Sequence, residues 1–212
     1  MEKVIDGAIG DELMKKLSDH PTAGLIGLAW MNAGSRNVYN SKHPIKAVED
    51  LKGLKIRMMG NPVFVDTMNS LGGNGIAMGY DQLVSALQTG VVDGAENNYP
   101  TYESGQHFRY AKYYSKTGHL MIPEILVFSK KVWEGLSKDD QALITKFAKE
   151  AQLEERKLWY EREKESLKKI IEAGAQVNEV KDKAAFQAAV KPVWDKYGAQ
   201  HTALIKRIQD VK

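Results

Sequence analysis

Two short segments constrain the possible folds of this chain most, because each has the pattern of a strand that ends at a polar residue. In the segment 51–58, apolar residues alternate with Lys55 and Arg57, which is the two-residue period of a strand with one buried face. The segment 86–97 combines the end of a helix with a strand that ends at Asn97. Ligands of open α/β sheets bind where strands end and where helix N-termini point their positive ends. The sequence therefore predicts that Arg57 and Asn97 lie in one carboxylate-binding cleft.

Strand and helix signals alternate along the first 129 residues. Helical patterns cover residues 10–18, 47–51, 62–71 and 80–89, and strand patterns cover residues 23–30, 36–40, 54–58, 91–98, 120–129 and a short stretch near 76. Pro62 suits the first turn of a helix and Gly90 suits a helix C-cap, whereas Pro123 interrupts the last strand pattern. This alternation predicts a parallel or mixed sheet with covering helices.

From Ser137 onward the pattern is that of one long helix. Ser137 suits an N-cap, acidic residues follow it, and Gly174 suits a C-terminal stop, so we expect a helix that runs to Glu172. Because its centre is mostly charged, we expect about half of its surface to face solvent. Two further helices are predicted at 184–197 and 199–211.

Composition argues against several classes of function. The 30 Lys and Arg residues interleave with 27 Asp and Glu residues, for a formal charge of +3, so no nucleic-acid partner is implied. The sequence contains no apolar run long enough to span a membrane. Without Cys, and with five dispersed His residues, neither thiol chemistry nor a zinc site is expected. No nucleophilic-serine or phosphate-loop motif occurs, and we expect no cofactor and no catalytic residue.

Four motifs carry a family resemblance by their order and spacing: Asp50-Leu-Lys-Gly-Leu-Lys-Ile-Arg57, Asn61-Pro-Val-Phe, Ala86-Leu-Gln-Thr-Gly and Val92-Asp-Gly-Ala-Glu-Asn97. They resemble the periplasmic solute-binding subunits of TRAP (tripartite ATP-independent periplasmic) transporters. The resemblance extends from about Asp6 to the C-terminus, and it implies an α/β, periplasmic-binding-protein-like (type II-like) fold of two lobes. It also implies that the family's signal peptide and first βαβ portion are missing, so we expect an N-terminally truncated chain.

The resemblance predicts three parts of the chain. Residues 1–31 would be a remnant of the first lobe with its crossover, residues 32–128 the second, ligand-binding lobe, and residues 129–212 a long helix spanning the lobes with C-terminal helices that pack on both. Because the first lobe would lack strands, we expect uncovered apolar surface at Leu143 and Phe147, and self-association or segment swapping.

Three polar residues are the main candidates for the ligand site. From spacing alone, Arg57 is a surface Arg in a modest salt bridge, whereas the resemblance implies a two-pronged salt bridge to the ligand carboxylate. Asn97 either caps the following helix or, as the resemblance implies, donates to the same carboxylate. Arg36 is either an edge-strand cation or approaches polar groups of the ligand, as the resemblance implies.

Four further candidates have both a plain and a functional interpretation. Trp30 and Tyr80 are core aromatics from sequence alone; the resemblance implies that Tyr80 lines the pocket and that Trp30 precedes the binding turn. Asn61 caps the helix that follows or hydrogen-bonds ligand hydroxyls. We expect Glu96 to support the site or to orient an Arg, because a carboxylate facing an anionic ligand would repel it.

The resemblance implies a non-enzymatic periplasmic receptor that delivers an organic acid to the membrane permease subunits of a TRAP transporter. Ligand would bind between lobes that close by hinge motion. The segment Ala95-Glu-Asn-Asn98, with Asn61 and Trp30, resembles members that bind hydroxylated monocarboxylates, that is, sugar acids such as uronates or aldonates. A receptor for C4-dicarboxylates is the alternative, and an enzyme that acts on a sugar acid is a further one.

Overall fold

The computed structural model describes residues 1–211, and the chain folds as two compact units. Unit 1 is formed by Met1–Gly34, Met121–Glu161 and the chain from Thr202 onward, and unit 2 by Ser35–Leu120 and Arg162–His201. Each unit is thus assembled from segments far apart in the sequence. The predicted division into residues 1–31, 32–128 and 129–212 stays a prediction.

Unit 1 is built on a two-stranded antiparallel sheet. In this sheet β1 (Leu25–Met31) pairs with β7 (Glu124–Ser129). The helices of the unit are α1 (Glu2–Ile5), α2 (Ala8–Asp19), α6 (Lys130–Trp133), the first part of α7 (Lys138–Glu172) and α10 (Thr202–Gln209). The core is small: Leu28 and Ala29 of β1 pack against Ala148 of α7.

An ion pair between a buried arginine and an exposed aspartate connects α7 to the start of the chain within unit 1. Both terminal nitrogens of Arg156 donate to the carboxylate of Asp6, at 2.5 and 2.7 Å. Gln152, one turn earlier, donates to the same carboxylate at 2.9 Å, and its own carbonyl oxygen accepts from the backbone N–H of Trp30. The hydrogen bond from Arg156 is the main reason why the pKa of Asp6 is lowered.

Part of the apolar surface of unit 1 is uncovered. Leu143 and Phe147 on α7 are 51% and 54% exposed, which confirms the predicted exposure of these two residues. With Leu126 and Val127 of β7 they line an open groove of about 400 Å³. Contiguous apolar surface of this kind is typical of a contact surface.

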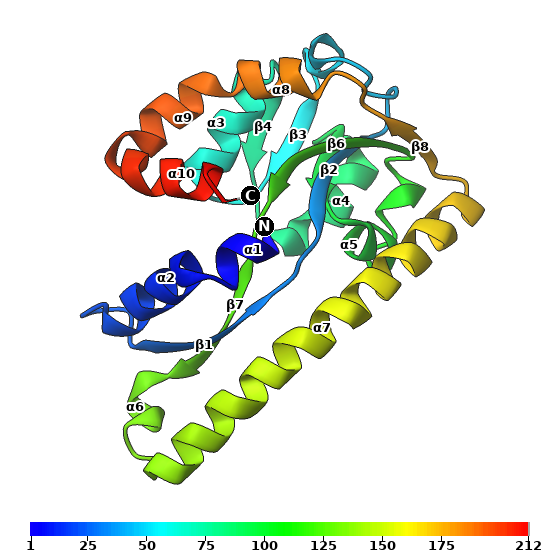
Figure 1. Ribbon diagram of the computed structural model, residues 1–212. Coiled ribbons are helices and arrows are strands. Elements are labelled where there is room, and N and C mark those ends of the chain that lie inside the picture. Colours follow the sequence, from blue (N-terminus) through cyan, green and yellow to red (C-terminus); the bar gives the residue numbers. More distant parts are fainter. Residues whose placement is uncertain (212) are drawn as a thin grey trace. The chain divides into compact units, whose positions relative to one another are not determined.

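Unit 2 is built on a six-stranded mixed sheet. Its strands are β2 (Ser35–Asn40), β3 (Lys55–Met58), β4 (Asn74–Ala77), β5 (Gly94–Asn97), β6 (Tyr113–Met121) and β8 (Gln176–Glu179), in the spatial order β4-β3-β5-β2-β6-β8 (Figure 1). β3 runs parallel to β4 and β5, and β6 runs parallel to β8, whereas β2 and β5 are antiparallel. The prediction of a mixed sheet is confirmed.

Helices and turns cover this sheet. They are η1 (Val48–Leu51), α3 (Pro62–Ser70), η2 (Tyr80–Gln82), α4 (Leu83–Thr89), α5 (Tyr99–Ser104), η3 (His107–Arg109), α8 (Lys183–Ala189), α9 (Lys191–Gly198), η4 (Ala199–His201) and the last part of α7. Neighbouring residues of β2 point to opposite faces of the sheet, and they enter different cores: Tyr39 packs in one apolar cluster and Val38 in another. The central strands are therefore buried on both faces.

The long helix agrees with the sequence pattern. α7 runs from Lys138 to Glu172 and is drawn in yellow in Figure 1. The Ser137 hydroxyl accepts from the backbone N–H of Asp140 at 3.1 Å, so Ser137 caps the helix as predicted. Gly174 follows the helix with a φ of +92°, a conformation that favours glycine.

Other boundaries differ from the prediction. The strand predicted from residue 91 begins at Gly94, and the segment predicted as one strand at 120–129 is divided between β6 and β7 around Pro123. β8 was not predicted, because its sequence Gln-Val-Asn-Glu contains one apolar residue and therefore shows no alternation. The helix predicted at 184–197 divides into α8 and α9, because Pro192 in the first turn of α9 has no N–H to continue a helix. Within residues 1–211 no helix combines the length and the apolarity needed to cross a membrane.

Candidate ligand-binding site

The strand pairing of unit 2 brings four of the predicted residues to one end of its sheet. Arg57 on β3 is in register with Ala95 on the parallel strand β5, and Glu96 and Asn97 follow at the end of β5. Because β2 runs antiparallel to β5, Arg36 at its beginning lies at the same end of the sheet.

Arg57 is a buried cation without a counter-charge. The residue is 4% exposed, its Nε donates to the carbonyl oxygen of Met78 at 2.8 Å, and its Cζ lies 5.9 Å from the ring centre of Tyr80. Among residues 1–211 no carboxylate pairs with it, and its two terminal nitrogens have no hydrogen-bond partner there, although they are not sealed from solvent. The alternative of a surface salt bridge is therefore wrong, because the side chain is buried.

Burial lowers the pKa of Arg57, and the nearby charges of Glu96 and Arg36 act on it in opposite directions. A guanidinium stays protonated in proteins nevertheless. Burying a charge without a partner is costly, and an anion that reached the two free nitrogens would remove this cost.

Asn97 does not cap the helix after it. Its carbonyl Oδ1 accepts from the backbone N–H of Asn98 at 2.9 Å, and Asn98 is the residue whose side chain caps α5, by accepting from the N–H of Thr101 at 2.8 Å. The Tyr114 hydroxyl donates to the Asn97 backbone carbonyl at 2.8 Å. The capping alternative for Asn97 is wrong because the cap lies one residue later, and its Nδ2 is left without a partner in the described chain.

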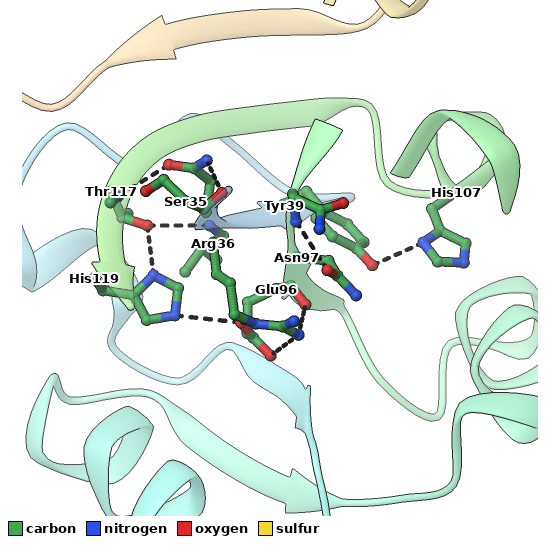
Figure 2. A network of polar contacts seen from close by, with 12 residues as sticks. Ser35, Arg36, Tyr39, Glu96, Asn97, His107, Thr117 and His119 are labelled. Atoms are coloured by element: carbon green, nitrogen blue, oxygen red, sulfur yellow. Dashed lines mark hydrogen bonds and ion pairs between the residues drawn. The ribbon is translucent and has the colours of Figure 1, made fainter. Parts of the chain in front are cut away.

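Arg36 and Glu96 form a bidentate ion pair, shown in Figure 2. Nε and Nη2 of Arg36 donate to the two carboxylate oxygens of Glu96 at 2.7 and 2.9 Å, and Nη2 also donates to the Glu96 backbone carbonyl at 3.2 Å. Glu96 is fully buried. Burial raises the pKa of Glu96, but the contacts with His119 and Arg36 outweigh it, and the pKa is lowered. The expectation that Glu96 orients an Arg agrees with this geometry.

A histidine on β6 completes this polar cluster and was not foreseen. His119 places Nδ1 2.8 Å from the Thr117 hydroxyl and Nε2 3.5 Å from Glu96 Oε2, which is within ion-pair distance but is not a hydrogen bond (Figure 2). The Thr117 hydroxyl accepts from the N–H of Val38 at 3.1 Å. The Tyr- and Thr-containing run at 113–117 has high strand propensity, and this signal could have revealed β6.

A second histidine lies on the other side of Asn97 in Figure 2. Nδ1 of His107 is 2.7 Å from the Tyr39 hydroxyl, and both residues are fully buried. Burial lowers the pKa of His107 to about 4, and the charge of Arg57 contributes. His107 is therefore neutral near pH 7, so it adds no positive charge beside Arg57. The sequence pattern does not indicate this contact, because Tyr39 and His107 are 68 residues apart.

The remaining predicted residues have separate locations. Asn61 is exposed and caps α3, since its Oδ1 accepts from the Val63 N–H at 3.0 Å; the capping alternative is confirmed. Tyr80 is 49% exposed, so the core-aromatic alternative is wrong for it. Trp30 belongs to unit 1 and is buried there, as a core aromatic is. Residues 1–211 contain no cluster of His, Asp and Glu side chains suited to a metal ion.

A mixed α/β sheet with an unpaired, buried guanidinium at its strand ends is suited to binding a carboxylate ligand, and the fold is that of a periplasmic binding protein, as predicted. The model of the DctP family, described as bacterial extracellular solute-binding protein family 7, matches residues 1–201. The chain belongs to this family.

Relatives agree with this assignment. The chain is 42% identical over 212 residues to a solute-binding protein of Chromohalobacter salexigens, covering 100% of this chain and 62% of that protein. It is 32% identical over 214 residues to the 2,3-diketo-L-gulonate-binding periplasmic protein YiaO of Escherichia coli, covering 99% of this chain and 64% of that protein. The chain thus spans less than two thirds of the length of these relatives.

Two solved structures of TRAP periplasmic solute-binding proteins are similar throughout this chain. The protein from Pseudomonas putida F1, with bound D-glucuronate, is 50% identical with a TM-score of 0.96, and the match covers 100% of this chain and 68% of that one. The protein from Sulfitobacter sp. NAS-14.1, with bound β-D-galacturonate, is 44% identical with a TM-score of 0.90, and covers 96% of this chain and 67% of that one.

Proposed function

We propose that this protein is the periplasmic solute-binding subunit of a TRAP transporter, and that it binds a sugar acid, a uronate or an aldonate, for delivery to the membrane permease subunits. The observation that carries the proposal is the buried guanidinium of Arg57, which has no carboxylate partner among residues 1–211. The similar proteins with bound glucuronate and galacturonate support the ligand class. Because the family is one of solute-binding proteins, we propose a receptor that releases its ligand unchanged.

The geometry of Arg57 suits one carboxylate. The bond from Nε to the Met78 carbonyl holds the guanidinium plane, and the two terminal nitrogens then form a fork that matches the two oxygens of a carboxylate. The free Nδ2 of Asn97 supplies a neutral donor on the neighbouring strand. In a site from which water is excluded, such charge-assisted bonds are stronger than in bulk solvent.

The proposed hydroxyl contacts come from the other candidates. Asn61 uses its Oδ1 for the helix cap and keeps its amide nitrogen for a ligand hydroxyl. The exposed ring of Tyr80 lies beside Arg57 and offers an apolar face to a sugar ring. We propose that Trp30 also contacts the ligand, because the family resemblance implies it.

Ligand-dependent stability tests this proposal on the full-length protein. Glucuronate, galacturonate or gluconate is expected to raise the melting temperature, because a ligand at 100 times its Kd stabilises the native state by about 2.7 kcal/mol. Succinate and malate serve as the controls and are expected to have little effect, since neither offers a row of hydroxyls. A shift with succinate alone would contradict the sugar-acid assignment, and ligand recovered in altered form by NMR would indicate an enzyme.

We also propose that residues 1–212 alone self-associate through the apolar groove of unit 1. Phe147→Glu places a charge on the exposed groove wall, so it is expected to shift the chain toward monomer at micromolar concentration. Leu158→Glu is the matched control, because Leu158 is also exposed on α7 but does not line the groove. Light scattering measures the mass; a monomeric parent chain would refute this proposal.

A further inference from the structure

Next to the predicted site lies a histidine that cannot itself touch the ligand. His107 is fully buried, and its Nε2 is sealed from solvent and has no hydrogen-bond partner within residues 1–211. Its other nitrogen, Nδ1, lies 2.7 Å from the Tyr39 hydroxyl (Figure 2). Because a ligand cannot reach this imidazole, any effect of His107 on binding must pass through its neighbours.

The backbone before this residue is shaped to place its side chain. Gln106 has a φ of +52° and is the only non-glycine residue with a positive φ among residues 1–211. Gly105 leaves room for the imidazole, because a Cβ there would clash with Nε2 of His107. A disfavoured backbone conformation persists only where the surrounding structure imposes it, and such positions cluster at functional sites.

Tyr80 is the neighbour that connects His107 to the ligand site. The ring centres of Tyr80 and His107 lie 5.9 Å apart with 60° between the ring planes, which is an edge-to-face arrangement. Tyr80 is 49% exposed, and its ring centre lies 5.9 Å from Cζ of Arg57. Since Tyr80 belongs to the three-residue turn η2, His107 gives this exposed ring a contact with the buried core.

The contact with Tyr39 ties the imidazole to the centre of the sheet. Tyr39 is fully buried on β2, in register with Ala95 of β5, and its ring stacks on that of His107 with the ring centres 5.5 Å apart. Burial lowers the pKa of His107, so the imidazole adds no second cation beside Arg57. A neutral histidine thus supplies both an aromatic edge for Tyr80 and a polar anchor to Tyr39.

We propose that His107, anchored by Tyr39, is a positioning residue that holds the Tyr80 ring as a platform for cyclic sugar acids; this inference rests on the proposed function. The C–H groups of a pyranose ring pack on the apolar face of an aromatic ring, and a contact group that is fixed in advance lowers the entropic cost of binding. An open-chain aldonate has no such flat face. The Tyr39–His107 pair therefore favours cyclic uronates over aldonates, while Arg57 binds the carboxylate that both ligands share.

Paired titrations of the full-length protein test the inference. Isothermal titration calorimetry gives the ratio of the Kd values for D-glucuronate, which is cyclic, and D-gluconate, which is open-chain. His107→Asn removes the ring edge that contacts Tyr80. It is expected to weaken glucuronate binding by at least about tenfold, the equivalent of 1.4 kcal/mol, and gluconate binding by less than about threefold. A general loss of stability would weaken both ligands alike, so the ratio separates positioning from a merely structural role.

Tyr102→Phe is the matched control. It also removes a buried hydroxyl contact of 2.7 Å, the bond that Tyr102 donates to the Ala111 carbonyl, but it keeps every ring of the cluster. Stability is expected to fall while the ratio stays unchanged. Tyr80→Ala removes the platform itself, so adding His107→Asn to that variant is expected to shift the ratio no further.

An equal loss for both ligands in His107→Asn, or a further shift in the Tyr80→Ala background, would overturn the inference, as would a parent that binds gluconate but not glucuronate. If His107→Asn does not fold, Tyr39→Phe decides the matter. That variant keeps every ring and removes the anchor, so it is expected to shift the ratio toward gluconate by at least about threefold; an unchanged ratio would contradict the proposal. A parent that binds neither ligand would instead refute the proposed function.

Discussion

Arg57→Ala is expected to bind a sugar acid at least about a hundredfold more weakly than the parent, because two hydrogen bonds between charged groups, at roughly 1.5–3 kcal/mol each, are lost. Arg57→Lys is expected to restore little of this affinity. An ammonium keeps the positive charge but cannot bind both carboxylate oxygens in one plane, and it also loses the bond from Nε to the Met78 carbonyl. Calorimetry on the full-length protein measures both variants.

Arg57→Ala should leave the unfolding free energy of the ligand-free protein nearly unchanged. The buried guanidinium has no carboxylate partner in the described chain, so its removal leaves no orphaned anion behind. Lys55→Ala is the matched control: Lys55 lies on the same strand, and its Nζ donates only to the Gly90 carbonyl, so its loss is expected to change affinity little. Arg57→Lys binding as tightly as the parent would show that Arg57 contributes only to the general field of the site.

Gly94→Ala is expected to destabilise unit 2 by about 3 kcal/mol or more, at the upper end of the usual cost of overpacking. A Cβ at this position would lie 2.0 Å from the carbonyl oxygen of Tyr39 and 2.9 Å from the Cα of Asn40. Both are backbone atoms of β2, which pairs with β5 at this point, so β2 and β5 must move apart. Urea unfolding at fixed temperature measures the loss.

Ligand affinity should fall in the same variant, because the β2–β5 pairing is what places Arg36 next to Glu96. Gly60→Ala is the control, since a Cβ there meets no atom within 4 Å, and it is expected to change stability by less than about 0.5 kcal/mol. If Gly94→Ala were as stable as Gly60→Ala, the two central strands would be less tightly paired than the structure indicates.

Local patterns predicted much of the secondary structure. The α7 helix, its Ser137 cap and the glycine after it are local features, in which residues a few positions apart decide the outcome. The strand that carries Arg57 was likewise visible from its two-residue period. Short strands without such a period, such as β8, and the beginning of β6 were missed, because their pairing with distant strands stabilises them more than their own sequence does.

The candidate site was predicted in part. Arg57, Asn97, Arg36 and Glu96 were named from motif positions, and the structure brings them to one end of a sheet. The partners of these residues were not foreseen: Met78, the residue after β4, and His119 on β6 reach the site through the folding of the sheet. The cap of α5 was predicted one residue too early, because adjacent Asn residues are equally good caps and only backbone geometry distinguishes them.

The sequence by itself determined the alternation of strands and helices, the polar residues at the strand ends and the family to which the chain belongs, because these depend on residue order and local propensity. Only the tertiary structure decided which arginine of the site is paired with a carboxylate and which is not. Whether an Arg is free or neutralised depends on which carboxylate lies within about 3 Å of it. That distance is set by the pairing of β2 with β5, which join residues 60 positions apart. The same pairing, with both faces of the sheet covered, buries Arg57 and leaves it without a carboxylate partner among residues 1–211.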